Sequence, residues 1–326
     1  MSAFDRAFAH VQAAIDAGRI PGAVLGLHDG TRHLCAAGLA QIVPDPAPMQ
    51  EATWFDLASL TKVVFTTTAI LDLVAAGRIG LDDPLTTAIP DLRQYDVAGA
   101  AERRLTFRQC LAHQTHLPAV EPLYTYGQDP QTLRAFILQR VWTPGPPVYS
   151  DNNFLLLGIA IERLTGRALP DQPLPAGFSF RPDPAICAAT ENCTWRGRVM
   201  RGQVHDENAY AMGGAAGHAG LFGTAAGLLD FASGLLAAPA RLALLATPHS
   251  PTRGLGWEIA HTGWSGGDAC PAGTIGHTGF TGTGLWINPA EGRAWTLLTN
   301  RVHPTRHFDS GIVALRRAVG EELAAG

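Results

Sequence analysis

Residues 58–62 read Ala58-Ser59-Leu60-Thr61-Lys62, a serine followed three positions later by a lysine. Lys62 is the one lysine among the chain's 24 lysine and arginine residues. Arginine serves wherever a fixed positive charge is enough, but its pKa is too high for it to give up a proton, whereas a buried lysine can do so. The stretch therefore predicts that Lys62 takes part in chemistry together with Ser59.

The residues after Ser59 predict a buried helix that begins at or near this serine. They are apolar nearly all round the helix from Val63 to Val74, and the pattern ends at Gly77. A spacing of three places Ser59 and Lys62 on one face, where a base can activate a hydroxyl. We expect burial to lower the pKa of Lys62 toward its working range. The alternative interpretation is a capping serine followed by a surface lysine.

The rest of the chain predicts strands at both ends and helices in the middle. Apolar spacing, turn residues and helix caps locate these elements. The expected helices are 4–18, 106–112, 129–142, 152–165 and 309–325, capped in the middle of the chain by Thr106, Asp129 and either Asp151 or Asn152. The expected strands are 23–27 and 33–36 as a hairpin, 255–259, 274–287 with glycine breaks, and 294–299. Prolines crowd between residues 167 and 201, which indicates an irregular connection.

This order of elements predicts an α/β protein with an inserted, mostly helical domain. The α/β domain is expected to be discontinuous and to take residues 1–76 and 221–326, with the insertion at 77–220. An active site is then expected in the seam between the two.

Two further segments carry residues suited to a site. The first, Pro144-Gly145-Pro146-Pro147-Val148-Tyr149-Ser150-Asp151-Asn152, ends a turn and begins a helix, so its polar residues project from a rigid loop. The second, Gly276-His277-Thr278-Gly279-Phe280-Thr281-Gly282-Thr283-Gly284, interrupts a strand with glycines, which lets a backbone approach a substrate closely.

Taken in order, these motifs resemble those of the serine β-lactamase and penicillin-binding protein superfamily. Ser-x-x-Lys is followed by a Tyr-Ser-Asn-like triplet at 149–151 and a Lys-Thr-Gly-like triplet at 277–279. The chain is most similar to the class C β-lactamase-related hydrolases, which include esterases and D-amino-acid peptidases. Segments 111–118 and 216–224 extend the resemblance over nearly the whole chain. It implies a β-lactamase-like fold, an antiparallel sheet flanked by helices.

The resemblance also implies roles for individual residues. Ser59 would be acylated, and Lys62 and Tyr149 would share the role of general base. The backbone N–H groups of Ser59 and Phe280 would form the oxyanion hole. The supporting residues would be Asp151, His277, Thr278 and Gly279, with His218 and Phe222 as possible pocket residues. Ser150-Asp151-Asn152 also spells the class A triplet, but Tyr149 and the preceding Pro-Gly turn favour the class C register.

Two departures from the family pattern predict changes in chemistry. Asp151 stands where the family has asparagine, and its carboxylate should keep Lys62 protonated and shift the base role toward Tyr149. His277 replaces a lysine and is mostly neutral at pH 7. We therefore expect a preference for esters or amides without an essential carboxylate, and weak or no β-lactam hydrolysis.

Composition bears on partners and location. The net charge is −4 and no Lys/Arg stripe is present, so neither nucleic acid nor a membrane surface is an expected partner. The chain opens without a signal-like segment and has five scattered cysteines without a CxxC pair, so a cytoplasmic location with reduced thiols is expected. His113 and His116 are three positions apart, rather than four, and lack the glutamate of a zinc motif, so no metal is expected.

The sequence thus predicts a serine hydrolase that acts through an acyl-enzyme on Ser59, a β-lactamase-related esterase that needs no cofactor. Its substrate would be a small ester, amide or lactam, while the sequence leaves the oligomeric state open. One alternative is a β-lactamase or D-amino-acid peptidase of the same fold. The alternative of another class is a non-catalytic binding or sensor module, which Asp151 and His277 would favour.

Overall fold

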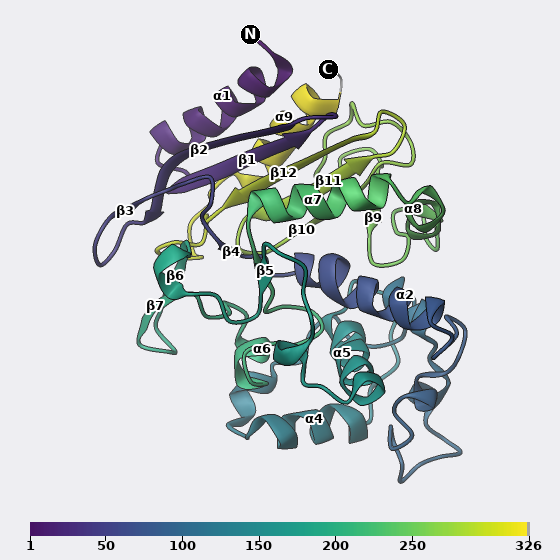
Figure 1. Cartoon of the computed structure of the whole chain (residues 1–326). Coiled ribbons are helices and arrows are strands. Elements are labelled where there is room, and N and C mark those ends of the chain that lie inside the picture. Colours follow the sequence, from purple (N-terminus) through teal and green to yellow (C-terminus); the bar gives the residue numbers. More distant parts are fainter. Residues whose placement is uncertain (325–326) are drawn as a thin grey trace.

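The structure, a computed structural model, describes residues 1–324 and is organised around one antiparallel sheet (Figure 1). Within these residues the sheet has seven strands. Their order is β3 (Ala47–Pro48), β2 (Arg32–Gln41), β1 (Gly22–His28), β12 (Arg293–Thr299), β11 (Thr283–Asn288), β10 (Ile275–Thr278) and β9 (Glu258–Ile259). The N-terminal hairpin therefore pairs with the C-terminal strands, because β1 lies directly beside β12.

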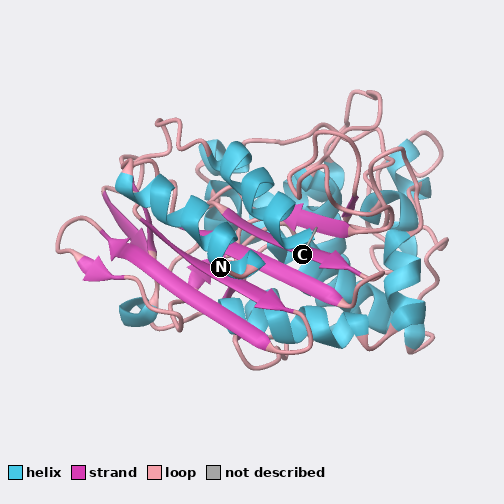
Figure 2. Cartoon of the chain, turned by 90° about the horizontal axis from the view of Figure 1, so that it is seen from above, coloured by secondary structure: helices cyan, strands magenta, loops and turns pink. Residues whose placement is uncertain are grey.

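Helices cover both faces of this sheet (Figures 1 and 2). α1 (Ala3–Asp16) and α9 (Ile312–Ala324) lie together on one face, and α7 (Ala225–Leu236) lies on the other. Because both faces are buried, β1 is apolar along its length instead of alternating with polar residues. In the described part of the chain no single helix is long and apolar enough to cross a membrane; α7 and α8 (Pro239–Ala246) reach that length only together and are bent by 99° at their junction.

A pair of tryptophans fixes the packing between the sheet and α1 and α9. Trp286 of β11 lies opposite Trp295 of β12, with ring centroids 6.0 Å apart. Both indoles are fully buried. Gly276 and Gly284 leave the space that the Trp286 ring occupies, since a Cβ at either position would collide with it. The glycines of this region therefore serve packing as well as the approach of backbone to a site.

The remaining elements form a mostly helical half on the other side of α7 (Figure 1). Its helices are α2 (Thr67–Ala75), α3 (Phe107–Leu111), α4 (Pro130–Gln139), α5 (Asp151–Thr165) and α6 (Glu207–Ala211). Short strands accompany them: β4 (Phe55–Asp56), β8 (Phe222–Gly223) and β5 (Phe178–Ser179) form one small sheet, and β6 (Ala189–Cys193) with β7 (Arg198–Arg201) forms a hairpin.

The α/β class and the antiparallel sheet flanked by helices are confirmed. Several details of the prediction were wrong. The expected strand 274–287 is two strands, because the chain reverses at residues 279–282, where Gly282 has a φ of +111°. The N-cap of α5 is Ser150 rather than Asp151 or Asn152. The connection at 167–201 contains β5 and the β6–β7 hairpin, and α7 and α8 had not been expected. The domain boundaries at 76/77 and 220/221 stay a prediction.

Candidate active site

Ser59 lies on a strained turn between β4 and the helix that leads into α2. Ala58 has a φ of +48°, in the left-handed region that residues with a Cβ rarely adopt. The helix is π-helical over Lys62–Thr66, and the hydroxyl of Thr67 donates to the Lys62 carbonyl at 2.7 Å. Local strain and single π-helical turns both occur preferentially at functional sites. The geometry around Ser59 has both features.

Lys62 is fully buried, and its ammonium has three acceptors around it. Nζ lies 2.8 Å from Ser59 Oγ, 2.8 Å from Asp151 Oδ1 and 3.3 Å from the carbonyl oxygen of His218. Burial alone would lower the pKa of Lys62, but the carboxylate of Asp151 and the phenol of Tyr149 outweigh burial and raise it above the ordinary value. The expectation that burial would bring the pKa of Lys62 down toward its working range was therefore wrong, whereas the raised pKa agrees with the expectation that the Asp151 carboxylate keeps Lys62 protonated.

Tyr149, in the loop in front of α5, and Asp151, the first residue of α5, both reach Lys62. The ring centroid of Tyr149 is 5.0 Å from Lys62 Nζ. Segment 111–118 and its continuation hold this loop in place: His113 Nδ1 accepts the Ser150 N–H at 3.0 Å, and the Asp151 N–H donates to the Ala119 carbonyl at 2.8 Å. The side chains of Ser150 and Asn152 both donate to the Pro118 carbonyl. The loop is thus anchored on both sides of the residues that face Lys62.

His277 on β10 is neutral and buried. Burial, together with the charges of Arg253 and Lys62, holds its pKa well below the ordinary value. Its Nδ1 lies 2.9 Å from the Thr278 carbonyl oxygen, which can only accept, so Nδ1 carries the proton. Nε2 is buried without a hydrogen-bond partner among the described residues. The ring of His277 therefore brings a lone pair on Nε2, and not a charge, to this side of the cavity.

The turn between β10 and β11 packs directly on the turn that carries Ser59. A Cβ at Gly279 would lie 2.5 Å from the Leu57 carbonyl oxygen, so this approach requires glycine. Arg316 of α9 donates to the carbonyls of Gly279 and Thr283 at 2.8 and 2.7 Å. In the described part of the chain, the N–H groups of Ser59 and Phe280 donate to no other group. Both remain available to an oxyanion, and this role stays a prediction.

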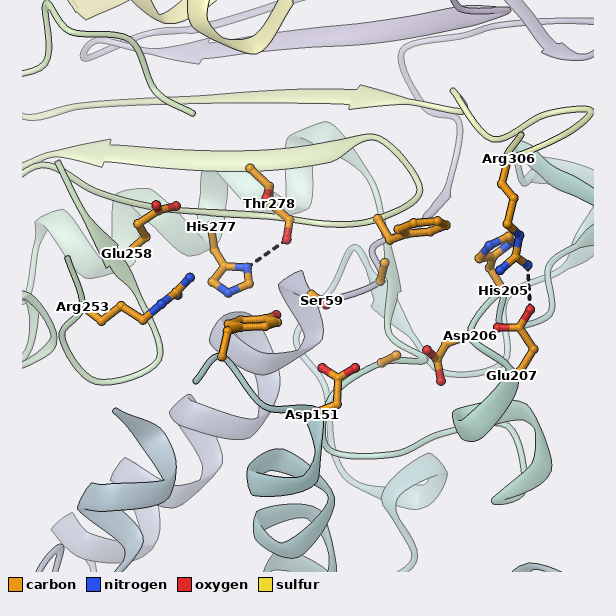
Figure 3. A pocket seen from close by; sticks show the side chains of 14 residues that line it. Ser59, Asp151, His205, Asp206, Glu207, Arg253, Glu258, His277, Thr278 and Arg306 are labelled. Carbon is orange, nitrogen blue, oxygen red and sulfur yellow. Dashed lines mark hydrogen bonds and ion pairs between the residues drawn. The ribbon is translucent and has the colours of Figure 1, made fainter. Parts of the chain in front are cut away.

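A cavity of about 450 Å³ opens over Ser59 (Figure 3). Ser59 lies between two groups of polar and charged side chains. One end carries Arg253, Glu258 and the neutral His277, and the other carries His205, Asp206, Glu207 and Arg306. Tyr149, Asp151, Thr278 and Phe280 also line the cavity. The structure thus brings together most of the residues predicted from the motifs, in the region between the sheet and the helical half.

The charged residues at the two ends were missed or set aside in the sequence. His205, Asp206 and Glu207 form no catalytic or metal-binding motif, and histidine and acidic residues in such a stretch more often order a loop. No local pattern marked Arg253. The guanidinium of Arg253 lies 4.8 Å from the Tyr149 ring centroid, and its Nη1 is buried with no partner among residues 1–324. Arg306 pairs with Glu191 and Glu207 at 2.5 and 2.6 Å. Of the two arginines that line the cavity, Arg253 is therefore the one without an ion-pair partner among the described residues.

Two possible pocket residues do not line the cavity. The prediction of Phe222 as a pocket residue was wrong, because this side chain is 1% exposed and lies in the small sheet, where it pairs with Asp56 and Ser179. The ring of His218 is also buried and lies behind Asp206, which lines the cavity. Its Nε2 is 2.8 Å from Asp206 Oδ1. His218 touches the site through its carbonyl oxygen. Among residues 1–324, no three His, Cys, Asp or Glu side chains converge as metal ligands.

Comparison with known proteins identifies the family and the fold. The family model described as Beta-lactamase matches residues 4–319. The chain is 29% identical to an N-acetylmuramyl-L-alanine amidase of Bacillus subtilis, covering 81% of this chain and 71% of the amidase. It is 30% identical to a putative D-alanyl-D-alanine carboxypeptidase of Escherichia coli, covering 80% and 72%. The structure resembles simvastatin synthase (LovD) of Aspergillus terreus, with a TM-score of 0.76, 21% identity and coverage of 100% and 98%.

Proposed function

Because this chain belongs to the Beta-lactamase family of serine hydrolases, we propose that it hydrolyses esters or amides through an acyl-enzyme intermediate on Ser59. The single observation that carries the proposal is the contact of Lys62 Nζ with Ser59 Oγ at 2.8 Å. A fully buried ammonium does not contribute to solubility, so its contacts with a serine hydroxyl and a carboxylate indicate another role. The contact with Ser59 supports a nucleophilic hydroxyl whose proton is transferred during the reaction.

The proposed reaction has two half-reactions. In the first, the Ser59 oxygen attacks the substrate carbonyl and its hydroxyl proton moves to the Tyr149 oxygen. The phenol passes its own proton to the leaving group, an alcohol or an amine, as the bond between the carbonyl carbon and that group breaks, so Tyr149 ends the step as a phenol. In the second, water attacks the acyl-enzyme and returns a proton to Ser59. Because Asp151 raises the pKa of Lys62, the lysine stays charged and stabilises negative charge on the Tyr149 and Ser59 oxygens. The N–H groups of Ser59 and Phe280 would hold the oxyanion.

The neutral state of His277 supports a substrate without an essential carboxylate at this position. The family pattern has a lysine there, whereas His277 offers only an acceptor nitrogen. Esters and simple amides fit this arrangement, and β-lactam hydrolysis is expected to be weak.

A second candidate function, a D-amino-acid peptidase, is favoured by Arg253. This guanidinium lines the same end of the cavity as His277 and has an unpartnered Nη1. It could receive a carboxylate of a peptide substrate in place of the missing lysine. The names of the two relatives, an amidase and a putative carboxypeptidase, also point to amide bonds.

Covalent labelling tests the proposed function. We expect a fluorophosphonate to label the protein once, on Ser59, as located by mass spectrometry of the digested protein. The Ser59→Ala variant should carry no label and should not hydrolyse p-nitrophenyl esters. Labelling without turnover of any ester, amide or lactam would favour a binding or sensor module instead.

An Arg253→Met variant separates the two candidate substrates. If a substrate carboxylate binds Arg253, KM for a D-alanyl-D-alanine peptide should rise by about tenfold or more, since a charge-assisted hydrogen bond contributes roughly 1.5–3 kcal/mol. KM for a neutral p-nitrophenyl ester should stay within about threefold of the wild type, because a neutral ester makes no such bond. Equal effects on both substrates would contradict a role in carboxylate recognition. Arg181, an exposed arginine on the surface, provides the matched control as Arg181→Met.

A further inference from the structure

Asp56 is a buried carboxylate that the proposed reaction does not use. It ends β4, three residues before Ser59, and only 2% of it is exposed. It does not line the cavity and has no ion-pair partner among residues 1–324. An unpaired carboxylate in such a place is costly to the fold, so its contacts require an explanation.

Each oxygen of this carboxylate accepts a backbone N–H from a different part of the site. Oδ1 accepts from Ala58 at 2.8 Å, the strained residue directly before Ser59. Oδ2 accepts from His205 at 2.6 Å, in the segment that forms the far end of the cavity. Asp56 therefore joins the nucleophile turn to a cavity wall 149 residues away in the sequence.

The backbone around Asp56 makes a third connection, to the turn that carries Phe280. The Thr281 hydroxyl donates to the Asp56 carbonyl at 2.7 Å, and the Thr283 hydroxyl donates to the Leu57 carbonyl at 3.0 Å. The ring of His205 in turn stacks on Phe280, with centroids 5.7 Å apart. Both backbone donors predicted for the oxyanion hole thus lie on turns that are tied to residues 56 and 57.

We propose that Asp56 is a positioning residue that sets the Ser59 turn against the Phe280 turn and the His205 segment. The inference rests on the proposed function, since it concerns the alignment of Ser59 and the two oxyanion donors. Asp56 acts through Ala58 and His205 and touches neither substrate nor reacting atoms. The hydrogen bond fixes the orientation of the Leu57–Ala58 peptide plane, from which Ala58, in its left-handed conformation, leads into Ser59.

The arrangement requires a carboxylate rather than any polar group of its size. Both oxygens accept from N–H donors, so an asparagine would have to direct its own NH2 group toward one of them. One buried donor would then lose its acceptor and face another donor, which disfavours the native turn. Asp56→Asn is therefore a conservative change in shape and a disruptive one in hydrogen bonding.

The same reasoning predicts a pH dependence. Burial raises the pKa of Asp56 to about 6, so the second acceptor is lost as the pH falls below that value. The groups that face Asp56 are Asp206 and His205, Arg196 of the β6–β7 turn, and the thiol of Cys187. None of them changes charge between pH 5 and 7: burial lowers the pKa of His205 to about 4, burial raises that of Cys187, and His218 holds that of Asp206 low against burial.

The stability of the folded protein should increase as the pH falls, in the direction opposite to the change in activity. The pKa of folded Asp56 lies above its ordinary value of 3.8, so protonation favours the folded state. The contribution of Asp56 to the free energy of unfolding therefore increases as the pH falls through 6. A loss of kcat between pH 7 and 5 caused by Asp56 occurs in a protein that stays folded, which near-UV circular dichroism can check.

The test compares Asp56→Asn with the wild type and with Glu102→Gln, a change at another buried carboxylate that pairs with Arg93 away from the cavity. We expect kcat for a p-nitrophenyl ester to fall about a hundredfold or more in Asp56→Asn, the scale of losing one oxyanion donor, with KM within about threefold. The wild type should lose kcat below about pH 6, and Asp56→Asn should lack this acid limb. Glu102→Gln should keep the wild-type kcat and pH profile.

Failure of this positioning role can be distinguished from failure of the proposed function. In the second case the wild type itself would show neither turnover nor labelling. If the wild type is active and Asp56→Asn keeps kcat within about threefold, the positioning role is overturned. If Asp56→Asn does not fold, the wild-type profile decides: an acid limb near pH 6 in a folded protein supports the role, and a flat profile from pH 7 to 5 overturns it.

Discussion

Lys62→Met is expected to lower kcat/KM for an ester substrate by at least about a thousandfold. Methionine keeps the length of the side chain but removes the ammonium that lies 2.8 Å from both Ser59 Oγ and Asp151 Oδ1. Without it, negative charge on the reacting oxygens is no longer stabilised at the site. Steady-state kinetics with a p-nitrophenyl ester measure the loss. A variant that keeps more than about a tenth of the wild-type activity would contradict the role of Lys62.

The same variant has a predicted cost in stability. Removing one partner of a buried ion pair typically costs about 3–5 kcal/mol, because the other charge stays buried alone. Asp151 is 19% exposed on its side chain, so we expect the lower end of this range. The double variant Lys62→Met/Asp151→Asn should recover most of the free energy of unfolding while its activity stays low. Urea unfolding of the two variants and the wild type measures this difference and separates chemistry from folding.

Tyr149→Phe is expected to lower kcat by about a hundredfold to ten-thousandfold, the range for loss of a general base. The substitution keeps the ring that lies 4.5 Å from His113 and under the guanidinium of Arg253, so the loop should keep its place. The free energy of unfolding should therefore change by less than about 1 kcal/mol, as for the loss of a single hydrogen bond. Only the phenolic oxygen, and with it the proposed proton acceptor, is removed.

The measurement for Tyr149→Phe is the rate of ester hydrolysis together with the rate of fluorophosphonate labelling of Ser59. Both should fall, because both require an activated serine oxygen. Tyr124→Phe, a change to a tyrosine outside the cavity, serves as the matched control. If Tyr149→Phe hydrolyses the ester within about threefold of the wild type, then Lys62 rather than Tyr149 takes the proton.

The motifs around Ser59, Tyr149 and His277 could be found in the sequence because each is a short local pattern with a chemical meaning. The sequence also indicated two opposite influences on the pKa of Lys62, burial and the Asp151 carboxylate, but it could not decide between them. The pKa of Lys62 depends on Asp151, 89 positions later in the chain, and the direction of its shift follows from a distance of 2.8 Å that no spacing encodes. Only coordinates decide which of the two influences is larger.

Long-range hydrogen bonds explain the other omissions. Asp56 shows no local signal, because its partner His205 comes from a segment that only the fold brings near. Arg253 is one arginine among many in the sequence, and its place beside Tyr149 arises from tertiary packing. The reversal at 279–282 was hidden because glycine, which permits the turn, also permits close packing within a strand. Local composition could not separate these two uses.

The stacked pair Trp286 and Trp295 also has a practical consequence. The two indoles are buried between the sheet and α1 and α9, and no tryptophan lines the cavity over Ser59. The emission of these two indoles therefore depends on whether the sheet and its covering helices are assembled. Because the chain has seven tryptophans, variants with phenylalanine at the other five positions would isolate this signal as a probe of unfolding.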